Sequence, residues 1–112
     1  MKTCRPYLIH ILQEIEYLST ASSHLTFEHF ASDETRKRAF VRSLEIIGEA
    51  VKNIPDSIRQ QYPVIAWRRI AGMRDKLIHA YFGVNYHLIW SVIQNELPDL
   101  KEQIQKILSE NK

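Results

Sequence analysis

The sequence is poor in the residues that build tight turns, because its 112 residues include only three glycines and four prolines. This scarcity argues against a β-rich fold and favours a few long elements. Its single cysteine, Cys4, excludes an internal disulfide and is typical of a reducing compartment. No apolar run approaches the length of a membrane span, and the N-terminal "MKTCRPYLIHIL" lacks the continuous apolar core of a signal peptide. We therefore expect a cytoplasmic protein without a membrane segment.

The chain also lacks a strong excess of one charge. Fifteen Lys and Arg stand against thirteen Asp and Glu, for a formal net charge of +2. This balance excludes a histone-like polycation, so a nucleic-acid partner would have to meet a local basic patch. Apolar residues make up 45% and charged residues 25%, which is ordinary for a globular chain. We expect one domain spanning residues 1–112.

Apolar residues recur at helical intervals through most of the sequence. The first stripe follows Pro6, which suits a first helical turn, and consists of Leu8, Ile11, Leu12, Ile15 and Leu18. After a connection with Thr26 or Ser32 as a helix cap, a second stripe consists of Phe40, Leu44, Ile47, Val51 and Ile54. Pro55 ends this second helix, because proline disfavours helical backbone in the residue before it.

Two more helices are predicted in the second half of the chain. The third spans about Val64–Ile78, and Gly83 suits the left-handed residue that closes a helix. Asn85 can cap the fourth helix, in which Pro98 predicts a kink or break near Glu96. Together the four segments predict an all-α, up-and-down bundle of four principal helices.

The stretch "GMRDKLIHAYFG" places charged and polar residues in the apolar third helix. On a regular helix at about 100° per residue, Arg74 falls near the middle of the apolar face and Tyr81 about 20° from it. His79 falls roughly 140° away from Arg74. A buried Arg needs a paired charge or access to water, so a structural Arg bonded to carbonyls or to an acid such as Glu45 or Glu49 stays open from the residues alone.

Arg74 and His79 together also suit cleavage of RNA without a metal. A guanidinium offers a planar fork of donors to phosphate oxygens, and it stabilises the added charge of the transition state. An imidazole that titrates near neutrality can move the proton at the 2′-hydroxyl or at the leaving oxygen. Because the wheel separates the two side chains, either the helix unwinds before Gly83 or two copies of the motif meet across a dimer.

The string Arg74 to Tyr81 resembles the R-x-x-x-x-H-x-Y motif of the HepT-like toxins of the HEPN ribonuclease superfamily. The flanking strings "RSLEIIGEAVKNIP", "WRRIAGMRDKLIHAYFGV" and "IWSVIQNELPDLKEQI" are similar to successive helices of that family. Asp75 also fits, because the superfamily often has a small polar residue directly after the Arg. The likeness covers most of the chain after about residue 33.

This resemblance implies a metal-independent endoribonuclease, toxic when free, in a type VII-like toxin–antitoxin pair with a minimal nucleotidyltransferase. It implies a homodimer whose two copies line one cleft with Arg74 and His79 as the catalytic pair. It further implies that the antitoxin transfers AMP to Tyr81. No cofactor is expected.

Other residues are weaker candidates for function. Glu49 could support Arg74, although a solvated role or an ion pair with Arg42 is the simpler interpretation of Glu45 and Glu49. Arg68 and Arg69 next to Trp67 could contact RNA. The simpler interpretation of that patch is a core Trp beside two solvated arginines. The other His residues show no spacing typical of a metal site.

A second hypothesis stays open from the sequence. A dimeric helical module without catalytic activity could bind and regulate a nucleotidyltransferase, with the same motif serving as an anion pocket. Both hypotheses share the fold and the partner, so only an assay of activity separates them.

Overall fold

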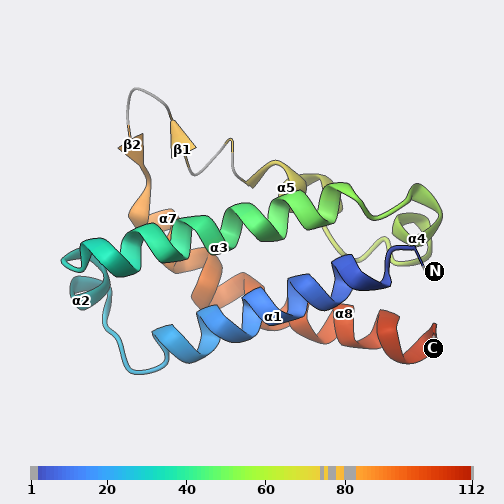
Figure 1. The fold of residues 1–112 in the computed structure, drawn as a ribbon, viewed down its shortest axis with the longest axis horizontal. Helices are drawn as coiled ribbons and strands as arrows, with labels where there is room; N and C mark the ends of the chain where they lie inside the picture. The colour runs from blue at the N-terminus through green and yellow to red at the C-terminus, as the bar shows by residue number, and fades with distance from the viewer. Residues whose placement is uncertain (1–2, 74, 76–77, 80–82, 112) are drawn as a thin grey trace.

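The computed structural model describes residues 3–73, 75, 78–79 and 83–111, with residues 78–79 described as backbone only. The described chain is mostly helical, as predicted (Figure 1). Its helices are α1 (Arg5–Ser22), α2 (Phe27–Ala31), α3 (Glu34–Lys52), α4 (Asp56–Gln61), α5 (Trp67–Ala71), α7 (Tyr86–Ser91), the π-helix η1 (Val92–Glu96) and α8 (Leu97–Glu110). Two short strands, β1 (Ile78–His79) and β2 (Gly83–Val84), form an antiparallel ladder.

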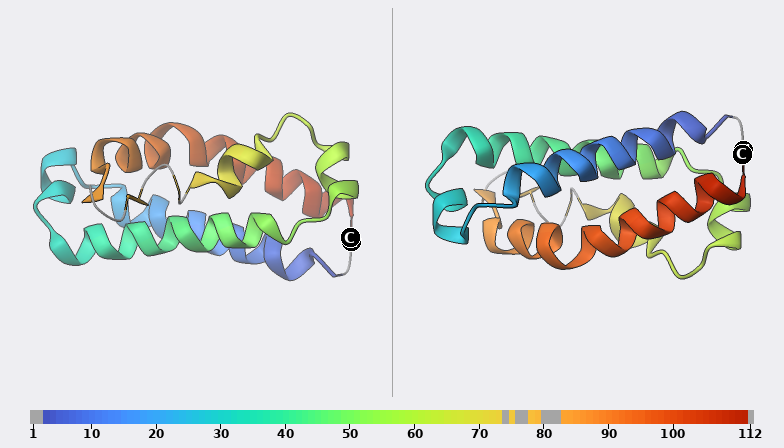
Figure 2. Two further views of the ribbon diagram at one scale, coloured as in Figure 1. Left: turned by 90° about the horizontal axis from the view of Figure 1, so that it is seen from above. Right: turned by 90° about the horizontal axis from the view of Figure 1, so that it is seen from below.

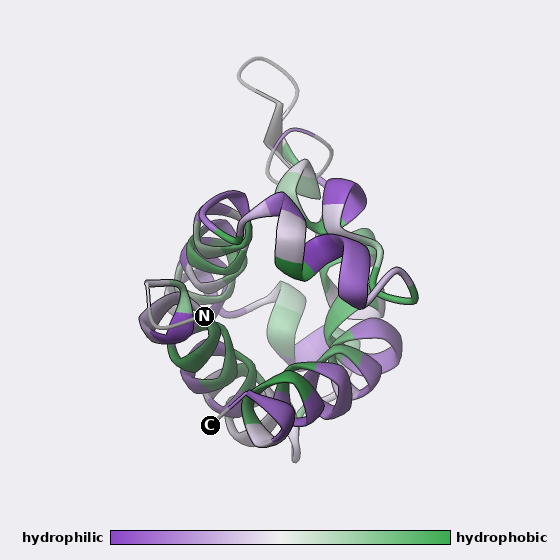
Figure 3. Cartoon of the chain, turned by 90° about the vertical axis from the view of Figure 1, so that its right-hand side faces the viewer, coloured by the Kyte–Doolittle hydropathy of each residue, from purple (hydrophilic) through white to green (hydrophobic). Residues whose placement is uncertain are grey.

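The long helices pack with their apolar stripes inward. α1 packs against α3 and α8, while α3 also packs against α5 (Figures 1 and 2). Viewed end-on, the hydrophobic residues of these helices face one another and the hydrophilic residues face outward (Figure 3). The stripes predicted for α1 and α3 are buried, except for the half-buried Leu12. Burial of apolar surface is the main favourable term in folding, so these stripes explain the bundle.

Most predicted helix boundaries are confirmed. Pro6 lies in the first turn of α1, which continues to Ser22, into the stretch "STASSHLT" (residues 19–26) that was expected to be a connection. Thr26 caps α2 by accepting a hydrogen bond from the His29 amide, at 3.2 Å. Asn85 caps α7 by accepting from the Leu88 amide, at 3.0 Å.

Asp33, rather than the predicted Ser32 or Thr26, caps α3. Its carboxylate accepts hydrogen bonds from the backbone amide and the Nε of Arg36, each at 3.1 Å. The hydrogen bond from the Arg36 amide lowers the pKa of Asp33 below its ordinary value of 3.8. A lowered pKa means that this cap stabilises the fold above that value and loses its effect as the pH falls through the folded-state pKa.

The predicted break at Pro98 is confirmed as a change of helix type. α7 continues through one turn of π-helix into α8, where Pro98 occupies the first turn. Proline carries no backbone N–H, so it interrupts the i to i−4 ladder at this point. The wider turn is closed by the Leu97 amide, which donates to the Val92 carbonyl.

An aromatic cluster joins α2, α3 and α7. The ring of Phe30 is fully buried, with its centroid 5.1 Å from that of Phe40 and 5.4 Å from that of Trp90. We expect Phe30→Ala to lower the free energy of unfolding by about 3–5 kcal/mol, because it leaves a cavity among these rings. Urea denaturation checks this, with Val64→Ala as a control because Val64 is 72% exposed. Equal stability of the two variants would contradict the central place of the cluster.

In the described residues, no helix is both long and apolar enough to cross a membrane.

Candidate functional site

The helix that leads into the predicted motif is shorter than the sequence predicted. The prediction of a helix over Val64–Ile78 is wrong at both ends. Residues 62–66 form turns, α5 covers only Trp67–Ala71, and the Gly72 amide closes it by donating to the Arg68 carbonyl. Met73 and Asp75 have helical backbone, and the Asp75 amide donates to the Gly72 carbonyl at 3.1 Å. The chain has turned into β1 by Ile78.

The strand at Ile78–His79 bears on the first of the two alternatives, unwinding of the helix, and leaves the dimer a prediction. His79 pairs with Gly83 and Ile78 with Val84 in an antiparallel register. Because His79 lies in extended backbone, it does not share a regular helix with the residues before it. The wheel angle between Arg74 and His79 therefore does not apply, and the helix ends before Gly83.

Gly83 has the left-handed backbone that the sequence predicted, with φ of +79°. Its predicted role was wrong, since it opens β2 and pairs with His79 instead of closing a helix. A Cβ at this position would meet nothing within 4 Å, so the backbone conformation alone favours glycine.

A substitution at Gly83 tests this backbone requirement. We expect Gly83→Ala to destabilise the protein by roughly 1–2 kcal/mol, because a Cβ is strained in left-handed backbone. Gly83→Asn should cost less, because Asn adopts that conformation more readily. Thermal unfolding of both variants gives the comparison, and an Ala variant as stable as wild type would contradict the assignment.

The remaining residues of the predicted site are only partly described. Arg74 and Tyr81 lie outside the described residues, and His79 is described as backbone only. Asp75 is exposed, beside the turn that follows α5. Within the motif the structure thus describes only Asp75 and the backbone of Ile78 and His79, and the roles of Arg74, His79, Asp75 and Tyr81 stay predictions.

Glu49 faces outward from α3. Its carboxylate forms an ion pair with Lys52 at 3.5 Å, and its side chain is 53% exposed. Glu45 forms an ion pair with Arg42 at 3.7 Å, as the simpler interpretation predicted. Support of Arg74 by Glu49 stays a prediction, because Arg74 lies outside the described residues.

Gly48, which the sequence reasoning did not single out, brings α5 against α3. A Cβ on Gly48 would lie 3.4 Å from the Ile70 carbonyl oxygen and 3.6 Å from that of Ala71. A methyl group would already be in contact, so a larger side chain would push α5 away. The small residue in the string "GEA" therefore fixes the position of the segment that leads into the motif.

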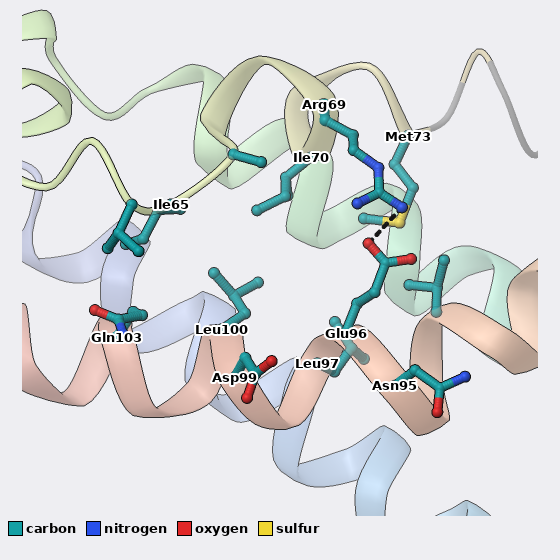
Figure 4. Close-up of a pocket in the computed structure, with 13 residues that line it drawn as sticks. Ile65, Arg69, Ile70, Met73, Asn95, Glu96, Leu97, Asp99, Leu100 and Gln103 are labelled. Carbon is teal, nitrogen blue, oxygen red and sulfur yellow. Dashed lines mark ion pairs between the residues drawn. The ribbon is translucent and has the colours of Figure 1, made fainter.

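Trp67 differs in burial from its two neighbouring arginines, as predicted. Trp67 is buried and its Nε1 donates to the Tyr62 carbonyl at 3.0 Å, whereas Arg68 and Arg69 are exposed. Arg69 is also engaged: its Nη2 lies 2.6 Å from the Glu96 Oε1, so the ion pair joins α5 to η1 (Figure 4). Contact of Arg68 or Arg69 with RNA stays a prediction.

The turn before α5 is tied to the end of α8. The Tyr62 hydroxyl donates to the Glu110 carboxylate at 2.7 Å and accepts from the side-chain Nδ2 of Asn111 at 3.1 Å. The hydrogen bond to Glu110 raises the pKa of Tyr62 above its ordinary value of 10.0. Together with the Arg69–Glu96 pair, this contact holds the α5 segment over η1 and α8 at two points.

A groove beside the Arg69–Glu96 pair lies between the segment of α5 and the η1 and α8 helices, and we call it the α5–α8 groove (Figure 4). Its volume is about 360 Å³. Its floor is apolar and consists of Ile65, Ile70, Met73, Val92, Leu97 and Leu100. Apart from the half-buried Ile70, these floor residues are buried. Met73 directly precedes Arg74 in the chain, so the groove adjoins the motif.

The described residues contain no group of three or more His, Cys, Asp or Glu side chains that could hold a metal ion.

Comparison with known proteins relates the chain to ribonucleases. A family model described as "Ribonuclease HepT-like" matches residues 11–107. A protein of Caldanaerobacter subterraneus subsp. tengcongensis named "Putative RNase" is 56% identical over 112 residues, which is the whole of both chains. The match includes α5, the motif and the groove.

Two archaeal proteins are also similar. One from Thermococcus cleftensis, named "Probable ribonuclease HepT", is 43% identical over 103 residues, covering 92% of this chain and 94% of its own. One from Methanocaldococcus jannaschii, named "Putative RNase", is 39% identical over 109 residues, covering 97% of this chain and 90% of its own. No solved structure gives a significant match.

Proposed function

Because the chain belongs to the family of HepT-like ribonucleases, we propose that it is a metal-independent endoribonuclease toxin of a type VII-like toxin–antitoxin system. The observation that carries the proposal is the family match over residues 11–107, which includes the R-x-x-x-x-H-x-Y string. The strand conformation of Ile78 and His79 is compatible with it, because His79 does not lie on a regular helix.

In the proposed reaction the 2′-hydroxyl of one nucleotide attacks the adjacent phosphorus. The bond to the 5′-oxygen of the next nucleotide breaks, leaving a 2′,3′-cyclic phosphate and a free 5′-hydroxyl. His79 moves a proton at the attacking or the leaving oxygen, since imidazole titrates near neutrality. Arg74 stabilises the added negative charge on the phosphate oxygens through two parallel hydrogen bonds. Asp75 and Glu49 are proposed as supporting residues.

Control of the activity is proposed to use Tyr81. A minimal nucleotidyltransferase antitoxin transfers AMP from ATP to the tyrosine hydroxyl, and pyrophosphate leaves. The new phosphate places negative charge near Arg74 and bulk in the cleft, so RNA is excluded.

The active form is proposed to be a homodimer with both motifs at one cleft. An isologous interface with a polar centre would accommodate Arg74 and Tyr81 in an otherwise apolar segment. Light scattering at micromolar concentration should give the mass of two chains. The mass of one chain would count against a composite site.

Growth of cells that express the chain alone separates this function from that of a non-catalytic module. We expect wild-type protein to arrest growth, while Arg74→Ala and His79→Ala restore it at equal protein level. Arg42→Ala is a matched control, because Arg42 is an exposed Arg of α3 paired only with Glu45 among the described residues. Equal growth with wild type and all variants would favour the regulatory module.

A further inference from the structure

The α5–α8 groove has the size of a ligand site, and no step of the proposed reaction uses it. Pockets that bind small molecules typically enclose roughly 300–1,000 Å³, with mostly apolar walls and a few convergent polar groups. The groove falls in this range at about 360 Å³, and its floor is apolar. The part of the ligand that enters should therefore be flat or compact, and largely apolar on its faces.

The polar groups around the groove define the edge of that ligand. They come from α5, η1 and α8 and consist of Arg69, Asn95, Glu96, Asp99 and Gln103 (Figure 4). Arg69 forms an ion pair with Glu96, and the side-chain Nδ2 of Asn95 donates to the Ser91 hydroxyl at 3.3 Å. Among the described residues, no hydrogen-bond or ion-pair partner occupies the side chain of Asp99 or Gln103. These two groups on α8 are available to a ligand.

The charges of the rim exclude a phosphate from the groove itself. The rim carries one guanidinium, which is already paired, and the two carboxylates of Glu96 and Asp99. Its formal net charge is therefore one minus two, or −1. An ionised carboxylate only accepts hydrogen bonds. The groove therefore suits a neutral apolar ring whose edge carries N–H donors. A nucleobase has this combination of an apolar face and a polar edge.

We propose that the α5–α8 groove is a nucleobase subsite that accepts one base of the RNA substrate and prefers an amino-bearing base over uracil. Adenine, cytosine and guanine each present an exocyclic amine that can donate to Asp99, with Gln103 able to donate to or accept from the neighbouring ring position. Uracil has no exocyclic amine: the two carbonyl oxygens that flank its single N3–H donor oppose a carboxylate. This inference rests on the proposed ribonuclease function and deepens it. Met73 on the groove floor is one peptide bond from Arg74, so recognition of a base here adjoins the proposed reaction centre.

Cleavage of an RNA pool with randomised sequence, followed by sequencing of the new ends, tests the preference. Among the ends that wild-type protein produces, uracil should be about tenfold under-represented at one fixed offset from the cut, which is the discrimination typical of a base-reading contact. Asp99→Asn should reduce the depletion, because an amide can donate to a uracil carbonyl, and Gln103→Leu should weaken selection among the other bases. Glu102→Gln is the matched control, since it removes a neighbouring exposed carboxylate of α8 that does not line the groove.

The outcomes separate the inference from the function on which it rests. Absence of cutting under all conditions contradicts the ribonuclease function. Cutting without any base depletion at a fixed offset overturns the subsite alone. The subsite is also overturned if Asp99→Asn leaves the depletion of uracil unchanged while Glu102→Gln removes it.

Methyl NMR reports occupancy of the groove independently of cleavage. Titration of the His79→Ala protein with a short adenine-containing RNA should shift the methyl signals of Ile70 and Leu100, while those of Ile9 on α1 stay in place. The same RNA with uracil at every position should shift them at least several-fold less at equal concentration. ATP binding more tightly than RNA at these methyls would identify a free nucleotide as the occupant and overturn the proposal.

Discussion

Arg74→Lys is expected to lower the rate of RNA cleavage by roughly 100-fold or more, the loss typical of removing one donor to a developing oxyanion. Lysine keeps the positive charge but is a single ammonium on a flexible stem. It cannot reproduce the planar, two-pronged contact of a guanidinium with phosphate oxygens. The rate constant kcat/KM with a fluorogenic RNA measures the loss.

Two comparisons make this result specific to the guanidinium. Arg42→Lys on α3 should cleave at the wild-type rate, because Arg42 is exposed and pairs with Glu45. Thermal unfolding of Arg74→Lys should match wild type, so that lost activity is not lost folding. Near wild-type cleavage by Arg74→Lys would mean that Arg74 supplies only charge, or nothing, to the reaction.

Tyr81→Phe is expected to abolish modification by AMP while RNA cleavage continues. A phenol with a pKa of about 10 is a poor general base at neutral pH, so its hydroxyl adds little to an Arg and His pair. Co-expression with the nucleotidyltransferase and ATP should add AMP to the wild-type chain and nothing to the variant. Intact-protein mass spectrometry measures the difference, and growth should stay arrested with the variant despite the antitoxin.

A second tyrosine controls for accessibility in this experiment. Tyr17 on α1 is 42% exposed, so Tyr17→Phe removes an accessible hydroxyl outside the motif and should leave the added mass unchanged. Loss of RNA cleavage in Tyr81→Phe would instead indicate a structural or catalytic tyrosine. Added mass that persists in Tyr81→Phe would place the modification elsewhere.

The caps and buried stripes of this fold could be predicted from the sequence because each depends on nearby residues. Thr26 and Asn85 cap helices through amides only three residues away, which the sequence lists directly. The stripe through Phe40, Leu44 and Ile47 is buried on one side of α3 because its spacing matches the helical repeat. Pro98 predicted a disturbed helix, but not that one π-turn would absorb it.

The end of the third helix could not be predicted from periodicity. Apolar residues continue at helical spacing to Ile78, yet α5 ends at Ala71 and the chain pairs as strands after it. Gly72 at this end and the left-handed Gly83 are the local signals for the change. Apolar spacing cannot tell a helix from a short buried strand once a glycine has intervened.

The groove could not be predicted because it depends on contacts between distant parts of the chain. Arg69 and Glu96 meet across it, and Tyr62 meets Glu110 beyond its end. The sequence offered Arg69 as a solvated residue and gave Glu96 only as the place of a break. The role of Gly48 could not be predicted either, because it depends on how closely α5 approaches α3.

Incubation of the purified protein with total RNA in excess chelator, followed by sequencing of the new ends, tests the central claim most directly. The proposed mechanism predicts discrete cuts that end in a 2′,3′-cyclic phosphate with wild-type protein, and none with Arg74→Ala or His79→Ala. Cleavage that appears only after magnesium is added, that leaves other ends, or that survives in both variants would contradict it.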